Sequence, residues 1–555
     1  MPSTALLAPA AVLVLGAGVG TGLAAGGLRL GRVPAATAAW LATAILSAIW
    51  LAGRAAQEMP GPQLGFGAPF SLRLDALSFA FSLFLLIPAA LLLTLQARSE
   101  ASAGGGAIAT AAGLLVVLAG GFSLAALLLG VVIVAAMIQL RSDGESGAGA
   151  FWPWLSAAWV GLVLAAAGLQ AGGGTSLYSA IPVRAMNGAL FTVLMASGIV
   201  IAGLLPWRSW PAELWDRPRL EAAGLTSALM TPIGIYLMIR ALDAADGQFP
   251  AGWIGPALMV VGLATTVSAS VRAQAAGSRR AYLSEMLPAT GGFALLALGA
   301  GTPLGLAGAV ATAAAAAAVA ALLPLIPDGG RAGALLSLGL AAGLPPGLTF
   351  GARLLDVGAA FESSEAAALL GLVATGAWIL GLAGAARAAW LPGRRTTPSA
   401  VGARGMSGLV ATLILILGVG LGILMTGVVL PAAAAVLRPQ TQPVTGGLIG
   451  IVTASGAWPA LTLAGPLLVL AGLLALASRP VWGAAPATRE AVPGPFFRIP
   501  IPSPVMRAVL SLRALRVPDE YHSLYDLRAA ERRLGMGTPS LWLAVVAALA
   551  FVVTR

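Results

Sequence analysis

The chain has 555 residues, of which 59% are hydrophobic and 9% are charged, and its mean hydropathy is +0.93. This composition excludes a soluble domain and predicts a polytopic α-helical membrane protein. The alternating period of transmembrane β-barrels is absent from the sequence. The formal net charge of +11 comes from arginines beside apolar segments, so it indicates membrane topology and not nucleic-acid binding.

Three residue types that carry chemistry are missing or nearly so. The chain has no cysteine, which excludes thiolate-held iron–sulfur clusters, disulfides and cysteine nucleophiles. Its single histidine, His522, lies outside the main apolar segments, which excludes haem ligation by pairs of histidines within the membrane. All 31 basic residues are arginine, and buried arginine keeps its proton where lysine can lose it. We therefore expect no cofactor, no metal site and no catalytic residue.

Apolar runs long enough to cross a membrane follow one another along the whole chain, and they predict about 14–16 transmembrane helices. The predicted helices are 5–25, 34–53, 74–95, 107–119, 122–140, 152–169, 188–205, 223–242, 253–271, 282–298, 303–325, 332–344, 365–386, 406–429, 458–477 and 539–553. We do not expect the first to be a cleaved signal peptide, because it lacks a basic start and more spans follow at once.

Arginines are concentrated in every second loop, and this bias predicts the orientation. The loops after odd-numbered helices hold Arg29, Arg32, Arg98, Arg141, Arg208, Arg217, Arg219, Arg272, Arg279, Arg280, Arg394, Arg395 and Arg404. The positive-inside rule therefore predicts a multi-pass protein of the bacterial inner (cytoplasmic) membrane, with the amino terminus outside and these loops in the cytoplasm.

The only long polar segment is residues 479–538, which the same rule assigns to the cytoplasm. Its first part is rich in proline, and residues 504–517 place apolar side chains opposite arginines, a pattern typical of a helix lying on a membrane surface. The alternative is a solvated linker before the last span. No nucleotide-binding loop is present in the sequence, which argues against ATP-driven transport.

Residues 196–240 contain an apolar segment that ends at Pro206, a short polar hinge and a second apolar segment. Pro232 lies inside the second segment, where it removes one backbone hydrogen bond, so we expect a broken helix near Thr231 and Pro232. Two ordinary spans with a proline kink are the alternative reading. Trp207, Trp210 and Trp215 in and beside the hinge are expected to be interfacial anchors.

Three stretches resemble a known family. Residues 70–83 read FSLRLDALSFAFSL, residues 202–213 and 227–236 read AGLLPWRSWPAE and SALMTPIGIY, and residues 301–310 and 343–350 read GTPLGLAGAV and GLPPGLTF. In this order they resemble the antiporter-like membrane subunits shared by respiratory complex I, group 4 membrane hydrogenases and Mrp-type sodium/proton antiporters. The third stretch looks most similar to hydrogenase-4 component B and formate hydrogenlyase membrane subunits.

The resemblance implies an all-α membrane fold with two inverted five-helix repeats, each containing a broken helix. The second break would lie around Pro345 and Pro346. The implied divisions are 1–105 (first three helices), 106–242 (first repeat), 253–390 (second repeat), 405–478 (C-terminal helices), 479–538 (cytoplasmic tail with the amphipathic helix) and 539–555 (last helix).

The chain departs from the family at nearly every position where the resemblance implies a proton-carrying residue. The expected glutamate falls near Gly130, the expected lysine on Ile201, and the histidine after the proline is Arg208. The next histidine and lysine fall near Ala313 and Ala320. Only the position after the double proline keeps a charge, as Arg353.

Few ionisable residues remain in or near the predicted spans. Candidate proton- or ion-path residues are Glu285, Arg353, Asp356, Arg208 and Arg240. For Glu285 the alternative is a capping or interfacial carboxylate that offsets Arg279 and Arg280, and Arg353 with Asp356 has the spacing of a structural ion pair. Arg240 is expected to snorkel to the cytoplasmic surface. Arg73 and Asp75 are expected to form an ion pair that fixes the loop before the third helix.

These departures predict an antiporter-like scaffold or accessory subunit in the membrane arm of a hydrogenase-like or complex I-like complex. It would be a non-catalytic part of an oxidoreductase-type assembly, with other membrane subunits and the lipid bilayer as partners. Three alternatives stay open. They are an active proton- or cation-translocating subunit, including the membrane half of a bicarbonate-uptake complex; a stand-alone secondary transporter using Arg353 or Arg208 as counter-charge for an anion; and a structural membrane protein outside any complex.

Overall fold

The computed structural model describes most of the chain up to residue 478. The described residues are 3–25, 33–53, 55–64, 68–96, 103–141, 151–205, 209–215, 220–274, 276–322, 324, 331–391, 411–437, 445–446, 450–453 and 456–478. The predicted tail, its amphipathic helix and the last predicted span lie outside this part.

Helices make up nearly all of the described chain. Their bounds are η1 Ser3–Leu7, α1 Ala8–Ala25, α2 Val33–Gly53, α3 Ala76–Gln96, α4 Ala103–Leu118, α5 Phe122–Arg141, α6 Phe151–Gly173, η3 Val183–Ala185, α7 Gly188–Ala202, α8 Ser209–Trp215, α9 Leu220–Ala244, α10 Ile254–Gln274, α11 Arg279–Gly299, α12 Pro303–Leu322, α13 Arg331–Ala341, α14 Leu348–Ser363, α15 Glu365–Trp390, α17 Leu421–Leu424, the π-helical turn η5 Met425–Val429, α18 Leu430–Ala434 and α19 Ala460–Ser478.

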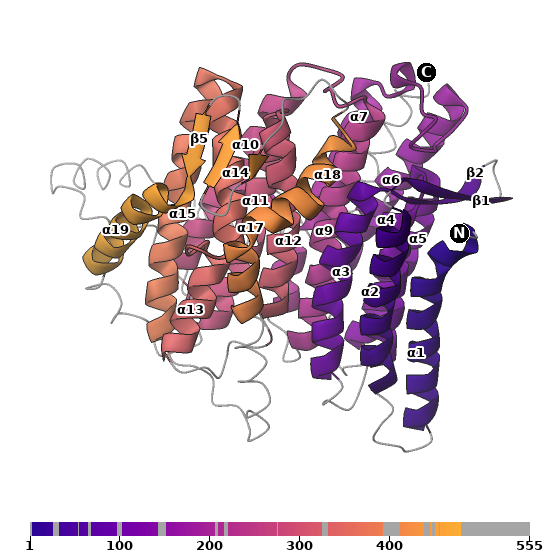
Figure 1. Cartoon of the computed structure of the whole chain (residues 1–555), viewed down its shortest axis with the longest axis horizontal. Coiled ribbons are helices and arrows are strands. Elements are labelled where there is room, and N and C mark those ends of the chain that lie inside the picture. Colours follow the sequence, from indigo (N-terminus) through magenta and orange to yellow (C-terminus); the bar gives the residue numbers. More distant parts are fainter. Residues whose placement is uncertain are drawn as a thin grey trace, which may run out of the picture.

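Among the described residues, ten helices are long and apolar enough to cross a membrane. The number is eleven if the bent pair 411–419 and 422–434 is one span, and three shorter apolar helices accompany them. The long helices run side by side as one bundle (Figure 1). The predicted all-α polytopic membrane fold is confirmed.

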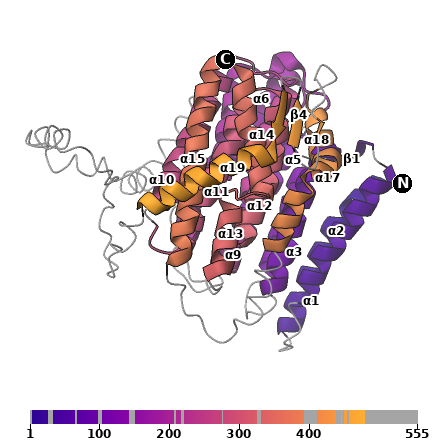
Figure 2. The same cartoon turned by 60° about the vertical axis from the view of Figure 1, so that its left-hand side comes forward.

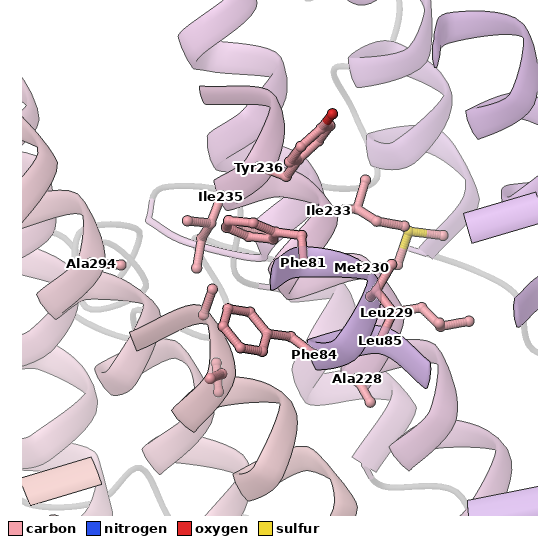
Figure 3. Close-up of a cluster of buried hydrophobic side chains, with 14 of the residues drawn as sticks. Phe81, Phe84, Leu85, Ala228, Leu229, Met230, Ile233, Ile235, Tyr236 and Ala294 are labelled. Atoms are coloured by element: carbon pink, nitrogen blue, oxygen red, sulfur yellow. The ribbon is translucent and has the colours of Figure 1, made fainter. Parts of the chain in front are cut away.

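Helix α9 lies at the centre of the bundle, and its whole apolar segment is buried. It packs against α3, α4, α7 and α12. Figure 3 shows Phe81 and Phe84 of α3 beside Ile233 and Ile235 of α9. The interface between the two helices is therefore filled by apolar side chains.

Glycines let α9 approach α7 closely. A Cβ atom built on Gly234 would lie 2.5 Å from the backbone nitrogen of Ala202, and one on Gly198 would lie 2.9 Å from the carbonyl oxygen of Gly234. Both distances are too short for a side chain, so only glycine permits this packing. Small residues at such contacts are typical of helix pairs in membranes.

The predicted break near Pro232 is wrong, because α9 continues through this proline without interruption. Neighbouring helices surround α9 on all sides, and such cover lets a helix keep its course when one backbone hydrogen bond is lost. The discontinuity lies earlier: α7 ends at the left-handed Gly203, and the short helix α8 precedes α9.

The tryptophans of the hinge are core residues, so the expectation of interfacial anchors is wrong for Trp210 and Trp215. Both are buried, and the Trp210 Nε1–H donates to the Val200 carbonyl at 2.7 Å. This bond satisfies a carbonyl near the end of α7, which gives the indole a reason to fold inward. Trp207 lies outside the described residues.

The second predicted break is present. Helix α13 ends at Ala341 and α14 begins at Leu348, with the double proline in the turn between them. The C-terminal region is less regular: α19 packs against α15 and runs obliquely to the bundle helices (Figures 1 and 2).

Two small antiparallel sheets accompany the helices. Strands β1 (Gln57–Leu64) and β2 (Ala68–Leu74) form a hairpin between α2 and α3, in which Glu58 faces Arg73. Strands β3 (Thr445–Gly446), β4 (Gly450–Thr453) and β5 (Gly456–Pro459) pair in that order before α19. The β1–β2 hairpin delivers Arg73 and Asp75 to the start of α3.

Candidate functional site: two buried charge clusters

Six charged side chains are buried in the described part of the chain: Asp75, Arg240, Arg279, Glu285, Arg353 and Asp356. Four of these, Asp75, Arg240, Arg353 and Asp356, belong to two clusters of polar side chains inside the bundle. We call these the Asp75 cluster (Arg73, Asp75, Tyr236, Arg240 and Asp243) and the Arg353 cluster (Thr312, Thr349, Arg353 and Asp356).

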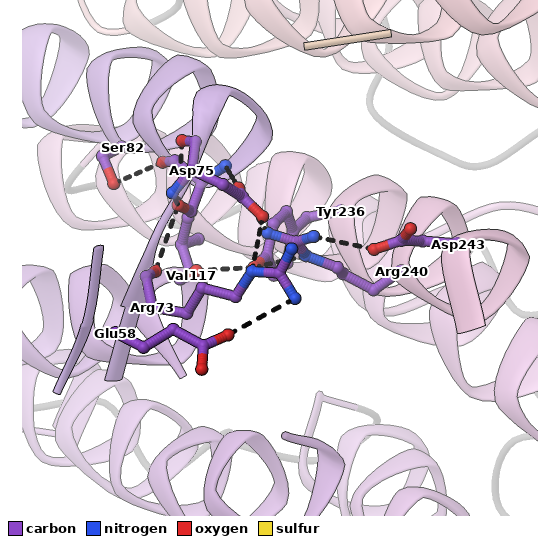
Figure 4. A network of polar contacts seen from close by, with 9 residues as sticks. Glu58, Arg73, Asp75, Ser82, Val117, Tyr236, Arg240 and Asp243 are labelled. Atoms are coloured by element: carbon purple, nitrogen blue, oxygen red, sulfur yellow. Dashed lines mark hydrogen bonds and ion pairs between the residues drawn. The ribbon is translucent and has the colours of Figure 1, made fainter. Parts of the chain in front are cut away.

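The Asp75 cluster joins two acidic residues through one arginine (Figure 4). The Arg240 Nη2 atom lies 2.6 Å from Asp75 Oδ1, and its Nη1 atom lies 2.9 Å from Asp243 Oδ2. The second oxygen of Asp75 lies 2.9 Å from Arg73 Nε. Each buried charge therefore has an opposite charge in direct contact, which a low-dielectric interior requires.

Asp75 also caps helix α3. Its Oδ1 accepts from the Ser78 backbone N–H at 2.9 Å, and the Ser78 hydroxyl oxygen accepts from the Asp75 backbone N–H at 2.8 Å. Burial alone would raise the pKa of Asp75, but the charges of Arg240 and Arg73 and these hydrogen bonds lower it from 3.8 to about 2. Asp75 is therefore ionised near neutral pH and does not exchange protons there.

Tyr236 connects the Asp75 cluster to a third helix. Its hydroxyl donates to the Val117 carbonyl near the end of α4 at 2.6 Å and accepts from Arg240 Nε at 2.9 Å. The Arg240 guanidinium also lies 5.2 Å from the ring centre of Tyr178. The cluster thus fixes the end of α9 to the start of α3 and the end of α4.

The Arg73–Asp75 pair expected from the sequence is present, and Glu58 of β1 extends it with an oxygen 3.7 Å from Arg73 Nη1. The expectation that Arg240 snorkels to the surface is wrong, because only 1% of its side chain is exposed. Two carboxylates and a phenol oxygen compensate its charge inside the bundle.

Sequence reasoning missed Tyr236 and Asp243 as members of this cluster. A signal was available: Tyr236, Arg240 and Asp243 follow the spacing of one helix face. The partner Asp75 lies 165 residues away from Arg240, so no local pattern could identify it.

The Arg353 cluster lies where α14 packs against α12. The Asp356 Oδ2 atom accepts from the Thr312 hydroxyl at 2.5 Å, and both residues are fully buried. A Cβ atom on Gly308 would lie 2.5 Å from Asp356 Oδ1, so glycine makes the room for this carboxylate.

The ion pair expected between Arg353 and Asp356 is absent from the described structure. The Arg353 Nη1 atom instead donates to the Ala342 carbonyl, and the guanidinium carbon lies 4.8 Å from the ring centre of Phe293. A side chain on a helix leans towards the amino terminus, which directs Arg353 to the break and away from Asp356 one turn later.

Arg353 therefore helps to cap the carboxyl end of α13. Two residues after that helix ends, Gly343 adopts the left-handed conformation at φ 86°, and the Leu344 N–H returns to the Gly339 carbonyl at 2.8 Å. Trp378 Nε1 donates to the Gly343 carbonyl at 3.2 Å. Cations and N–H donors at this end satisfy the last carbonyls and oppose the helix dipole.

The remaining predicted residues lie apart from both clusters or outside the described chain. Glu285 is buried within α11, whose amino-terminal cap is Ser278, accepting from the Ala281 N–H at 3.0 Å. Arg279 Nη2 donates to the Ala389 carbonyl at 2.9 Å. Arg208 lies outside the described residues. An ion-path role for any of these side chains stays a prediction.

Charged side chains are rare in three helices of the described bundle. Helices α3 and α12 contain no charged residue, and α9 has none between Glu221 and Arg240. Hydroxyls of α3 bond to nearby backbone carbonyls, as Ser82 does to the Ser78 carbonyl at 2.7 Å. In α9, Thr231 donates to the Ala202 carbonyl of α7, and the buried Thr226 and Ser227 hydroxyls have no hydrogen-bond partner in the described part of the chain. Among the described residues there is also no group of three or more acidic, histidine or cysteine side chains that could hold a metal ion.

The sequence matches no known protein family and no curated protein. Its fold, in contrast, is similar to chains of solved membrane complexes. It aligns with a chain of the Mrp complex from Dietzia sp. DQ12-45-1b at a TM-score of 0.72 and 21% identity, over 98% of this chain and 63% of that one. The chain thus spans less than two thirds of that Mrp chain.

Two further structures share the fold. A chain of the membrane-bound sulfane sulfur reductase, an archaeal respiratory membrane complex, aligns at a TM-score of 0.68 and 18% identity, over 98% of this chain and 99% of that one. A chain of respiratory complex I from Thermus thermophilus aligns at 0.64 and 19% identity, over 79% and 99%. These likenesses show the fold, which is that of membrane chains in all three complexes.

Proposed function

From the premise that the chain has the antiporter-like membrane-subunit fold, we propose that it is a membrane-arm subunit of a multisubunit respiratory or ion-translocating complex. Within it, the chain serves as a scaffold and does not itself conduct protons. The fold likeness to chains of three membrane complexes supports the first part. Other membrane subunits and the lipid bilayer are the partners that this role requires.

The observation that carries the scaffold role is the composition of α9. This helix is central and wholly buried, yet over the five turns between Glu221 and Arg240 its only ionisable side chain is the phenol Tyr236. Proton transfer through hydrocarbon needs side chains that exchange protons near neutral pH, or water held by polar groups. Phe81, Phe84 and their neighbours fill the space beside α9 instead (Figure 3).

Arginine strengthens this argument. The two buried arginines of the clusters, Arg240 and Arg353, keep their protons at any physiological pH. They are fixed positive charges that stabilise helix ends, and they cannot take up and release protons in turn. The scaffold role therefore agrees with the chemistry of both clusters.

The second candidate function is translocation of protons or another cation, as a subunit of a respiratory complex or as the membrane half of a bicarbonate-uptake complex. Glu285 and Asp356 favour it, because both are buried acids and their helices α11 and α14 pack together. Such a path would use the second half of the bundle only.

Purification of the intact complex from native membranes tests the first part of the proposal. The scaffold role predicts that the chain copurifies with other membrane subunits in fixed ratio, and that its loss disperses them. If the chain purifies without other subunits from a detergent extract of native membranes, the scaffold role is contradicted.

Proton flux distinguishes the two functions. The full chain is reconstituted in liposomes, and proton uptake is driven by a potassium gradient with valinomycin. The scaffold role predicts uptake no faster than in protein-free liposomes, for the native chain and for Glu285→Gln alike. Faster uptake that Glu285→Gln abolishes would establish the second function.

A further inference from the structure

One edge of a buried guanidinium group has no partner in the described structure. Arg353 is 1% exposed, and its Nη1 atom donates to the Ala342 carbonyl. Its Nε and Nη2 atoms are buried and make no hydrogen bond. These two atoms form the side of the guanidinium that binds two coplanar oxygens at once.

A second unpartnered donor lies on the same helix face. The Thr349 hydroxyl is fully buried and has no hydrogen-bond partner. It lies one turn before Arg353, at the amino-terminal turn of α14, and helical side chains four residues apart share a face. Other buried hydroxyls of the bundle bond to a backbone carbonyl, as Thr290 does to that of Met286 at 2.8 Å, while Thr226 and Ser227 of α9 also lack a partner within the described chain.

Two positive groups lie near this edge. Arg353 carries a permanent charge, and the amino end of α14 adds the positive end of a helix dipole. Asp356, the nearest acid on this helix, makes no ion pair with Arg353 and directs Oδ2 to Thr312 on α12. The carboxyl end of α13 and Asp356 oppose the charge of Arg353 without an ion pair, so an anion in contact with the free edge would stabilise this buried cation further.

We propose that the Nε/Nη2 edge of Arg353 and the Thr349 hydroxyl together bind one small planar oxyanion at the break between α13 and α14. Two guanidinium N–H groups hold two of its oxygens, and the threonine O–H donates to it as a third contact. Phe293 lies over one face of the guanidinium, with its ring centre 4.8 Å from the guanidinium carbon. Pro346, three residues before Thr349, is exposed at the surface of the described bundle.

The anion would act as a resident counter-ion that joins the two half-helices. Arg353 contacts the carboxyl end of α13 through Ala342, while the bound anion would sit at the amino end of α14. This inference does not depend on the scaffold role, since a conducting subunit could hold the same ion.

Nitrate is a suitable probe, because it is planar and fully ionised and so carries no protons across membranes. The apparent melting temperature of the purified full-length chain is measured as nitrate replaces chloride at constant ionic strength. Binding predicts a saturable rise of about 2 °C or more for the native chain.

Two variants separate this site from general salt effects. Arg353→Lys keeps the charge but lacks the two-atom edge, so the nitrate-dependent rise should disappear. Thr349→Val removes one neutral donor without altering the charge, so it should keep its melting temperature in chloride and need several-fold more nitrate for the same rise.

Three results would overturn the proposal. They are no saturable rise in the native chain, a rise of equal size in Arg353→Lys, or an unchanged nitrate requirement in Thr349→Val. If Arg353→Lys does not fold, the Thr349→Val titration decides alone. None of these results bears on proton flux, so the proposed scaffold role is tested separately.

Discussion

Arg240 of α9 and Asp75 at the start of α3 form a buried ion pair of 2.6 Å, although 165 residues separate them in the sequence. The pair joins the central helix of the bundle to the helix that packs along it. Asp75 caps α3 with the same oxygen that contacts Arg240, so one carboxylate fixes both a helix end and a helix contact.

Replacement of Asp75 by Asn should destabilise the protein strongly. Arg240 would keep only Asp243 as a charged partner, and Arg73 would lose its contact with Asp75. Breaking a buried pair from one side typically lowers the free energy of unfolding by about 3–5 kcal/mol. Thermal unfolding in detergent measures this loss.

Glu58→Gln is the matched control, since it removes an ion pair of 3.7 Å to Arg73 whose acid is 47% exposed. Exposed pairs contribute about 0–1 kcal/mol. Equal losses in the two variants would show that the buried contact has no special importance.

The pH dependence of stability should carry the signature of Asp75. Its pKa is lowered in the folded protein from 3.8 to about 2, so its ionised form stabilises the fold above the unfolded value. The contribution, on the order of 2 kcal/mol, should be complete above about pH 5 and disappear as the pH falls from about 4 to about 2. Across this pH range, the free energy of unfolding should fall in the native chain, and it should fall less in Asp75→Asn.

Gly308→Ala should disturb the Arg353 cluster. The added methyl group would lie 2.5 Å from Asp356 Oδ1, so α12 and α14 must separate or Asp356 must leave Thr312. Overpacking of this kind lowers the free energy of unfolding by about 1–3 kcal/mol.

Gly376→Ala offers a comparison within a helix, because no atom lies within 4 Å of the Cβ position there. Its free energy of unfolding should change by no more than the difference in helix propensity, about 1 kcal/mol, and in the stabilising direction. If Gly376→Ala lost as much stability as Gly308→Ala, the loss in Gly308→Ala would be a general effect of replacing a helical glycine and not a result of the contact with Asp356.

The sequence predicts those parts of the fold that depend on local composition. Apolar runs predict the helices, and the double proline predicts the break before α14. Arg73 and Asp75 are expected to pair because they are two residues apart in the sequence. Each of these follows from residues that are close together in the chain.

Features that depend on distant contacts escape such reasoning. Pro232 does not break α9, because the helices around it stabilise the continuous form. Arg240 stays inside because Asp75 lies opposite it, and Trp210 turns inward to the Val200 carbonyl. The hairpin before α3 was also missed, since prolines at positions 60 and 62 argue against a strand unless it lies at a sheet edge.

The central claim, that the bundle has lost the means to conduct protons, is tested most directly by proton uptake into liposomes that contain the purified full-length chain. Uptake driven by a potassium gradient should equal that of protein-free liposomes at every pH between about 6 and 8. In this range neither Arg240 nor Arg353 exchanges its proton. Uptake that exceeds this background and falls in Glu285→Gln or Asp356→Asn would contradict the claim.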